Sequence, residues 1–353
     1  MKNTRKLLAA LLAVLMMMPV FAVASSARAA TNRYEGKSLV VLGDSIAAGF
    51  GLAPGSTDMV SQILQMPHGE FTPNSWPLAI RDKYGFSKET SVNLSRSMWR
   101  CDEFLRLLDP AFEAEICKPE NTFEQYMSDY LMCFTELTAP GDALQLKSQI
   151  RGAIEQADVL VFSLCSNDIM SATIAKPFML PFYQVFGRQA CYALATVTQG
   201  KLQLPTTPEG LAKFALGTLE FDDLASDARR RTQQFFKNYD RLLGIIYRLN
   251  PDVEVYTMGM TNPFKGLKTI NGQDSTLFAP LTEENIRLIK NYVTKQSRYA
   301  GRVKYVDCSD VGGHGFGNAY SVQFLLDFVV HVHPDAAGHQ RIIKHVSDAF
   351  DKK

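Results

Sequence analysis

Short apolar segments alternate with longer amphipathic segments along most of this chain, and that alternation constrains its fold more than any single motif. The short segments are rich in Val, Ile and Leu, which is typical of strands buried on both faces of a parallel sheet. The longer segments carry apolar residues at helical spacing, so each has one face that can pack on such a sheet. We therefore expect an α/β fold in which helices cover both faces of a five-stranded parallel sheet.

The same pattern predicts where each element lies. Strands are predicted for the run that ends at Gly43 and for Ser91–Leu94, Val159–Leu164, Val253–Met258 and Val303–Val306. Helices are predicted from Ser75 to Tyr84, over Arg100–Leu108 and Ile150–Ala157, around Phe235–Ile246, after a cap at Thr282, and from an N-cap at Asp335 to Phe350. Two stretches, about 110–145 and 169–223, lack a clean period and are predicted to be insertions. The second is rich in Pro and aromatic residues, and it either packs its own small core or forms a lid.

The first thirty residues have the pattern of an export signal. Basic residues precede an apolar run from Leu7 to Ala24, and an Ala-x-Ala site follows, so residues 1–29 are predicted to be a signal peptide. A retained membrane anchor is the alternative, although Pro19 interrupts a run of barely spanning length. Cleavage would leave residues 30–353 as one domain outside the cytoplasm, with a formal charge of −3 in place of +1. This charge does not indicate a nucleic-acid partner.

Six cysteines would then lie in an oxidising compartment. Their spacing does not select a pairing, and no Cys-x-x-Cys pair indicates a zinc or redox site. We expect one or two disulfides at most, with Cys101, Cys117 and Cys133 as the favoured partners.

The first predicted strand ends in Gly43-Asp44-Ser45, and small residues follow. In open α/β sheets ligands bind in the crevice beyond the carboxyl ends of the strands, so a serine held there on a tight turn is a candidate nucleophile. The tripeptide taken alone favours a plain strand-to-helix turn in which Asp44 or Ser45 caps the next helix. More distant residues have to decide between these interpretations.

Three further polar segments are candidates for the same edge of the sheet. They are Asn93–Arg100 after the second strand, Ser163–Asp168 after the third, and His331–His339 near the C-terminus. In a three-layer α/β/α, flavodoxin-like sheet of order 2-1-3-4-5, the second and third strands flank the first, so both of their loops reach toward Ser45. A hydroxyl, an imidazole and amide donors that converge in this way supply what acyl transfer needs.

These segments resemble the SGNH, or GDSL, hydrolase family. Its first, third and fifth sequence blocks are similar, in the same order, to Gly43-Asp44-Ser45, Ser166-Asn167-Asp168 and His333-Pro334. The resemblance implies that Ser45 is the nucleophile and His333 the general base, with no metal or other cofactor. It also implies that the backbone N–H groups of Ser45 and Met98 and the side-chain amide of Asn167 form an oxyanion hole.

Three positions depart from the family pattern. Met98 and Cys165 stand where the family has glycine, and Val330 stands where the acidic partner of the catalytic histidine is expected. Met98 can supply its backbone N–H provided that the loop does not require positive φ, which residues with a side chain adopt reluctantly. Without an acid at Val330, a backbone carbonyl or Asp327 would have to orient His333, or the site would be weakened or inactive.

Several polar residues near these blocks have plainer interpretations. Asn167 is also a suitable cap for a helix after the third strand, and His339 and His345 are expected on the surface of the last helix. A metal site at His331, His333 and His339 is not favoured. His331 and His333 would point to opposite sides of an extended segment, and no Cys or carboxylate accompanies them at ligand spacing.

Together with the candidate site and the export signal, the resemblance implies an exported serine esterase or lipase that hydrolyses carboxylic esters through an acyl-serine intermediate. The exported location and the apolar insertion favour a lipid or acylated-carbohydrate substrate, with transient contact to a membrane or cell envelope. Two alternatives remain open. One is an acyltransferase that acts on cell-envelope sugars with the same serine, and the other is a non-catalytic binding protein with a degenerate site.

Overall fold

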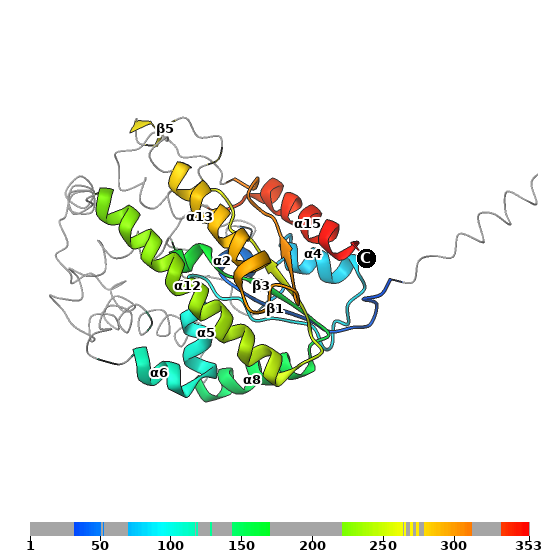
Figure 1. Ribbon diagram of the computed structural model, residues 1–353. Helices are drawn as coiled ribbons and strands as arrows, with labels where there is room; N and C mark the ends of the chain where they lie inside the picture. The colour runs from blue at the N-terminus through cyan, green and yellow to red at the C-terminus, as the bar shows by residue number, and fades with distance from the viewer. Residues whose placement is uncertain are drawn as a thin grey trace, which may run out of the picture.

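A parallel five-stranded sheet forms the centre of the molecule (Figure 1). The computed structural model describes residues 32–50, 52, 70–116, 118, 128, 143–169, 221–263, 265, 269–270, 273–274, 279–312 and 333–352. In spatial order the strands are β2 (Val92–Asn93), β1 (Leu39–Gly43), β3 (Val159–Ser163), β4 (Glu254–Met258) and β7 (Val303–Val306). Counted along the chain this is the order 2-1-3-4-5, so the predicted topology is confirmed.

Helices cover both faces of the sheet, which confirms the three α/β/α layers. Alternate side chains of β1 point to opposite faces, as the strand period requires. Val40 and Leu42 enter one apolar core, and Leu39 and Val41 enter the other. The first core is closed by α5 (Cys101–Leu108), α6 (Pro110–Ile116), α8 (Ala143–Gln156), α12 (Phe221–Leu249) and α13 (Ala279–Asn291), and the second by α2 (Ser45–Ala48), α4 (Trp76–Lys83) and α15 (Ala336–Phe350).

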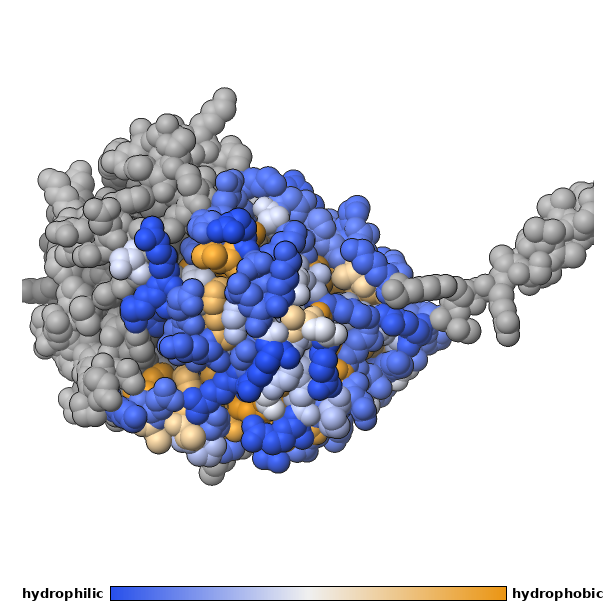
Figure 2. Space-filling model, viewed as in Figure 1, coloured by the Kyte–Doolittle hydropathy of each residue, from blue (hydrophilic) through white to orange (hydrophobic). Residues whose placement is uncertain are grey.

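The described surface is mainly hydrophilic in the view of Figure 2, and its apolar residues are scattered among polar ones. This agrees with the burial of the apolar helix faces against the sheet. Within the described part of the chain, no helix has both the length and the apolarity needed to span a membrane.

Some element boundaries differ from the prediction. α13 begins at Ala279, so the cap predicted at Thr282 is wrong. Pro280 marks the true start, because proline is well tolerated in the first turn of a helix. A π-helical turn, η4 (Tyr292–Gln296), continues α13. A two-stranded antiparallel hairpin of β5 (Thr269–Ile270) and β6 (Gln273–Asp274) was not anticipated.

The predicted insertions are only partly visible. Residues 110–116 form α6, which packs against α5 and places Phe112 and Ile116 in the first core. Most of residues 117–142, nearly all of 169–223, and the predicted signal peptide lie outside the described residues.

Two expectations about buried side chains are wrong. Cys101 is a free thiol in the first core rather than a disulfide partner, because it lies at the inner start of α5; Cys117 and Cys133 lie outside the described residues. His339 is fully buried, and its Nδ1 accepts the backbone N–H of Trp76 at 3.3 Å at the start of α4. His345 does lie toward the surface, where it pairs with Asp310.

Candidate active site

Ser45 lies in the turn that leaves β1 at the carboxyl edge of the sheet. The side chain of Asp44 caps α2 by accepting the backbone N–H of Ile46 at 3.0 Å. A Cβ atom at Gly43 would lie 2.6 Å from Cβ of Ala47 and 2.8 Å from Oγ of Ser95, so only glycine fits this packing. The hydrogen bond from Ile46 confirms the capping interpretation of Asp44. It is compatible with a nucleophile at Ser45, the first residue of the capped helix.

His333 reaches this turn from near the far end of the chain. Its Nε2 lies 2.6 Å from Oγ of Ser45. Phe50, which follows α2, packs its ring against the imidazole with the two ring centroids 4.6 Å apart. A serine hydroxyl at hydrogen-bond distance from an imidazole nitrogen is the arrangement that general-base catalysis of acyl transfer requires.

Two loops beside the turn have backbone conformations that favour glycine. Met98, between β2 and α5, has a φ of 68°, and Cys165, just after β3, has a φ of 139°. The loop of Met98 does require positive φ, and Met98 adopts this conformation despite its side chain, so its backbone N–H stays available as a candidate donor. Such a conformation costs on the order of 1–3 kcal/mol in a residue with a side chain, and it persists only where the surroundings impose it. Both loops thus keep the backbone shape that glycine would adopt.

Asn167 connects these two loops. It lies in the helical turn 166–169, and its Nδ2 donates to the backbone carbonyl of Trp99 at 3.2 Å. A capping side chain accepts a backbone N–H, whereas this amide donates, so the bond is not a helix cap. The structure thus brings Asn167 to the loop of Met98, and brings Ser45 to His333.

No protein-family model and no curated protein sequence matches this chain. Several solved structures are similar to it. The extracellular lipase of Streptomyces rimosus is 17% identical, with 89% of this chain and 99% of that chain covered and a TM-score of 0.47. Phospholipase A1 of Streptomyces albidoflavus is 13% identical, with the same coverage and a TM-score of 0.47. A carbohydrate esterase of family 3 from Talaromyces cellulolyticus is 14% identical, with 88% and 95% covered and a TM-score of 0.34. These similarities concern the fold only, so any statement on function has to rest on the site itself.

Asp44 is a buried carboxyl group directly before the candidate nucleophile. Burial raises its pKa to about 7, although hydrogen bonds from the backbone N–H groups of Ile46 and Ala47 act in the opposite direction. Both protonation states of Asp44 are therefore populated near neutral pH, and the folded protein binds a proton there more readily than the unfolded chain does.

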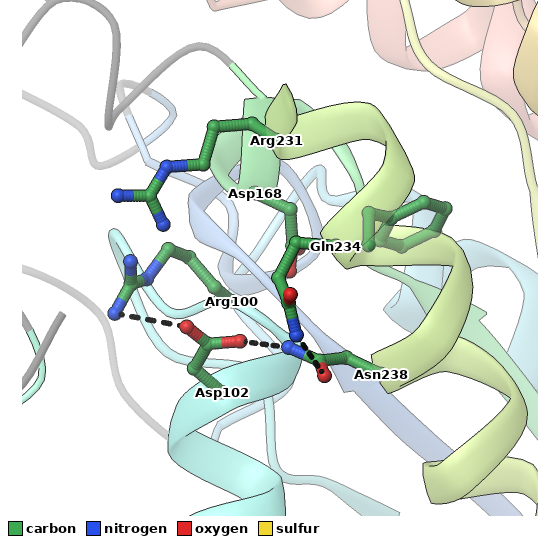
Figure 3. A pocket seen from close by; sticks show the side chains of 7 residues that line it. Arg100, Asp102, Asp168, Arg231, Gln234 and Asn238 are labelled. Carbon is green, nitrogen blue, oxygen red and sulfur yellow. Dashed lines mark hydrogen bonds and ion pairs between the residues drawn. The ribbon is translucent and has the colours of Figure 1, made fainter. Parts of the chain in front are cut away.

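A network of buried polar side chains connects the start of α5 with the turn that carries Asn167 (Figure 3). The guanidinium of Arg100 lies 2.7 Å from the carboxylate of Glu103 and 3.6 Å from that of Asp102. Asp168 accepts the backbone N–H of Cys101 at 3.0 Å, so the residue after Asn167 is bonded to the start of α5. Burial, followed by the nearby charge of Asp102, raises the pKa of Asp168 well above its usual range.

The network extends to α12. The amide of Asn238 donates to the carboxylate of Asp102. A cavity of about 10 Å³ lies between α5 and α12, and it has room for about one water molecule. Its lining consists of Arg100, Asp102, Asp168, Arg231, Gln234, Phe235 and Asn238. Buried polar contacts therefore connect three elements: the start of α5, the turn that carries Asn167, and α12.

Other predicted residues stand as follows. Asp335 is the N-cap of α15, with its carboxylate accepting the backbone N–H of Gly338 at 2.7 Å, so that prediction is confirmed. Asp327, Val330 and His331 lie outside the described residues, and so does any bond they make to His333. Among the residues that the structure describes, no three His, Cys, Asp or Glu side chains come together in a way that could hold a metal ion.

Neither the buried network nor the contact of Phe50 with His333 was predicted from the sequence. The acids at positions 102 and 103 are typical of an exposed first turn of a helix, where negative charge is favourable. Their burial depends on α12, more than a hundred residues away, and no local pattern signals it. Phe50 is a single aromatic residue after a run of small ones, and nothing nearby in sequence connects it with His333.

Proposed function

We propose that this chain is a serine hydrolase that cleaves carboxylic esters through an acyl-serine intermediate. The observation that supports this most directly is the 2.6 Å separation of Oγ of Ser45 and Nε2 of His333, from residues 288 positions apart. The pair lies where strands of an open parallel sheet end, which is where such folds bind ligands.

In the proposed reaction, His333 Nε2 takes the proton of Ser45 as Oγ forms a bond to the ester carbonyl carbon. The backbone N–H groups of Ser45 and Met98 and the amide of Asn167 stabilise the oxyanion. Loss of one such donor lowers turnover about a hundred- to a thousandfold. The protonated imidazole then donates its proton to the departing alcohol as the C–O bond breaks. Water, deprotonated by His333, finally releases the acid and restores Ser45.

The imidazole has to be held for both proton transfers. Phe50 packs against its ring and limits its rotation. A backbone carbonyl or Asp327 is the proposed partner of its other ring nitrogen, where an acid normally orients a catalytic histidine.

The non-catalytic alternative is less well supported by the loops. A binding protein without catalysis has no need to keep Met98 and Cys165 at positive φ, because relaxation of either loop would remove the associated strain. An acyltransferase would use the same serine and histidine but exclude water, so only its products distinguish it.

The direct test is hydrolysis of 4-nitrophenyl acetate and 4-nitrophenyl butyrate by the protein and by Ser45→Ala. We expect activity in the wild type and its loss in Ser45→Ala. Ser347→Ala is a matched control, since it removes a buried, unbonded hydroxyl from α15, away from the site. Labelling by a fluorophosphonate without hydrolysis would indicate acyl transfer, and absence of both signals would indicate a binding protein.

The natural substrate is proposed to be a lipid or an acylated carbohydrate met outside the cytoplasm after removal of residues 1–29. A panel of esters of increasing acyl length, together with fractionation of cells that express the full chain, tests these two points separately.

A further inference from the structure

Arg96 is a buried cation next to the candidate site, and within the described residues its guanidinium has neither a hydrogen-bond nor an ion-pair partner. Only 5% of its surface is exposed. Its Nε and Nη1 atoms are enclosed and have no hydrogen-bond partner. Within the described ranges, no carboxylate forms an ion pair with it. Arg100, four residues later and more deeply buried, contrasts with this because it is paired with Glu103.

The isolation of Arg96 is unfavourable to folding. Burial lowers its pKa to about 10, and no neighbouring acid offsets this change. The group still carries its charge at neutral pH, and a buried charge is normally paired or bound to a ligand. Among the described residues, the ring of Trp99 offers this guanidinium a cation–π contact, which does not supply the hydrogen bonds that a guanidinium loses on burial.

The position of Arg96 points to a role at the active site. Its backbone N–H donates to the carbonyl of Gly43 at 3.0 Å, two residues before Ser45. Its guanidinium carbon lies 5.4 Å from the ring centroid of Trp99, whose carbonyl receives the amide of Asn167. Arg96 therefore belongs to the loop between β2 and α5, which contacts both the turn of Ser45 and the side chain of Asn167.

We propose that Arg96 binds an anionic group of the substrate, a phosphate or a carboxylate, beside the reacting ester. This inference rests on the proposed function, and it narrows the lipid or acylated-carbohydrate class to its negatively charged members. The planar guanidinium forms strong, charge-assisted hydrogen bonds with either anion, and a bidentate contact requires that Nε or Nη1 be uncovered beside Nη2. Nη2 is not among the enclosed atoms, so it is the nitrogen through which an anion first makes contact.

Two matched substrate pairs test this inference. 4-Nitrophenyl hexanoate and mono-4-nitrophenyl adipate differ by a carboxylate on the acyl chain, and 1-butyrylglycerol and its 3-phosphate differ by a phosphate on the alcohol. We expect the wild type to prefer the anionic member of one pair at least tenfold in kcat/KM. Arg96→Gln should reduce that preference at least tenfold, and Arg96→Lys should reduce it less, since lysine keeps the charge but not the paired donors.

Arg151→Gln is the control, because Arg151 is an exposed arginine of α8 paired with Glu155. It should leave the preference unchanged. An equal rate on both members of each pair in the wild type, or an unchanged preference in Arg96→Gln, would overturn the proposal.

A measurement independent of catalysis separates this proposal from the proposed function. Inorganic phosphate should raise the Tm of the wild type and of Ser45→Ala but not of Arg96→Gln or Arg96→Met, because a ligand stabilises only the state that binds it. If phosphate acts in this way while no ester is cleaved, the anion site stands and the hydrolase proposal fails. If phosphate acts through Arg96 but neither anionic ester is preferred, the anion is a free ligand and the substrate proposal is wrong.

Discussion

The turn that carries Ser45 and the two loops beside it reach the same edge of the sheet by different means. In the turn, glycine stands where the backbone needs it: Gly43 allows close packing, and Gly49 has a φ of 83° at the end of α2. In the flanking loops, residues 94–100 and 164–168, Met98 and Cys165 hold positive φ with side chains attached. The turn is therefore encoded locally, whereas the flanking loops depend on contacts from elsewhere in the fold.

In both regions a buried aspartate accepts a backbone N–H at the start of a helix, but the donor lies at a different separation along the chain. Asp44 accepts an N–H from its own turn, two residues away. Asp168 accepts the N–H of Cys101, 67 residues away, and joins the network of Arg100. A local cap can form as soon as the turn forms, whereas the second contact requires that β3, α5 and α12 have already packed.

The largest expected effect comes from breaking the network. Asp168→Ala leaves the buried N–H of Cys101 without its acceptor and opens a cavity, and it should lower the free energy of unfolding by about 3–5 kcal/mol in total. Asp168→Asn should cost less than half of this, because burial favours the neutral form of Asp168 and asparagine is a neutral isostere. Urea denaturation measures both.

Asp348→Ala is the control for the network, since Asp348 pairs with Lys344 on the exposed side of α15. It should lower the free energy of unfolding by less than about 1 kcal/mol. An Asp168→Asn variant as unstable as Asp168→Ala would show that the charge, not the hydrogen bond, holds the loops.

Because Asp44, the N-cap of α2, titrates, the free energy of unfolding should depend on pH. Asp44 has a pKa of about 7 in the folded protein and about 4 when unfolded, so the folded state binds more protons between these values. Its contribution to stability therefore falls as pH rises from about 4 to 7 and is constant above that range. The total change is at most about 4 kcal/mol.

Asp44→Asn should remove this slope while keeping a good cap, because asparagine caps helices nearly as well as aspartate. The difference between the unfolding free energies of the two proteins, measured at several pH values, isolates the effect. Parallel curves for wild type and variant would show that Asp44 does not titrate in this range.

The smallest expected effect concerns the flanking loops. At Met98, glycine should be more stable than alanine by about 1–2 kcal/mol, because only alanine pays the steric cost of positive φ. The same pair at Gln149, an exposed position in α8, should show the opposite order by about 1 kcal/mol. Chemical denaturation of the four variants provides the comparison, and alanine equal to glycine at position 98 would mean that the loop relaxes.

Much of the fold could be predicted because its signals are local. The apolar runs of β1 and β3 and the helical spacing of α5 and α15 are properties of neighbouring residues, and Asp335 caps α15 where its sequence indicates. Even the error at Thr282 was local, since Pro280 marks the start of α13.

Burial of polar side chains was predicted less well. His339 shares the inner face of α15 with Ile342 and Val346, so helical spacing could have indicated its burial. The charges around Arg100 had no such signal. Whether a charged residue is buried depends on partners that other elements bring to it, and those partners are distant in sequence.

The sequence by itself determined the alternation of strands and helices, the order of the sheet, and the placing of Ser45, Met98 and Asn167 after the ends of their strands, because strand and helix periods and turn residues act over a few positions. Only the tertiary structure decided that His333 lies against Ser45, that Met98 and Cys165 hold positive φ, and that Arg96 is buried with no hydrogen-bond or ion-pair partner for its guanidinium among the described residues. These features arise from packing between segments far apart along the chain, and such packing can outweigh local preference by a few kcal/mol.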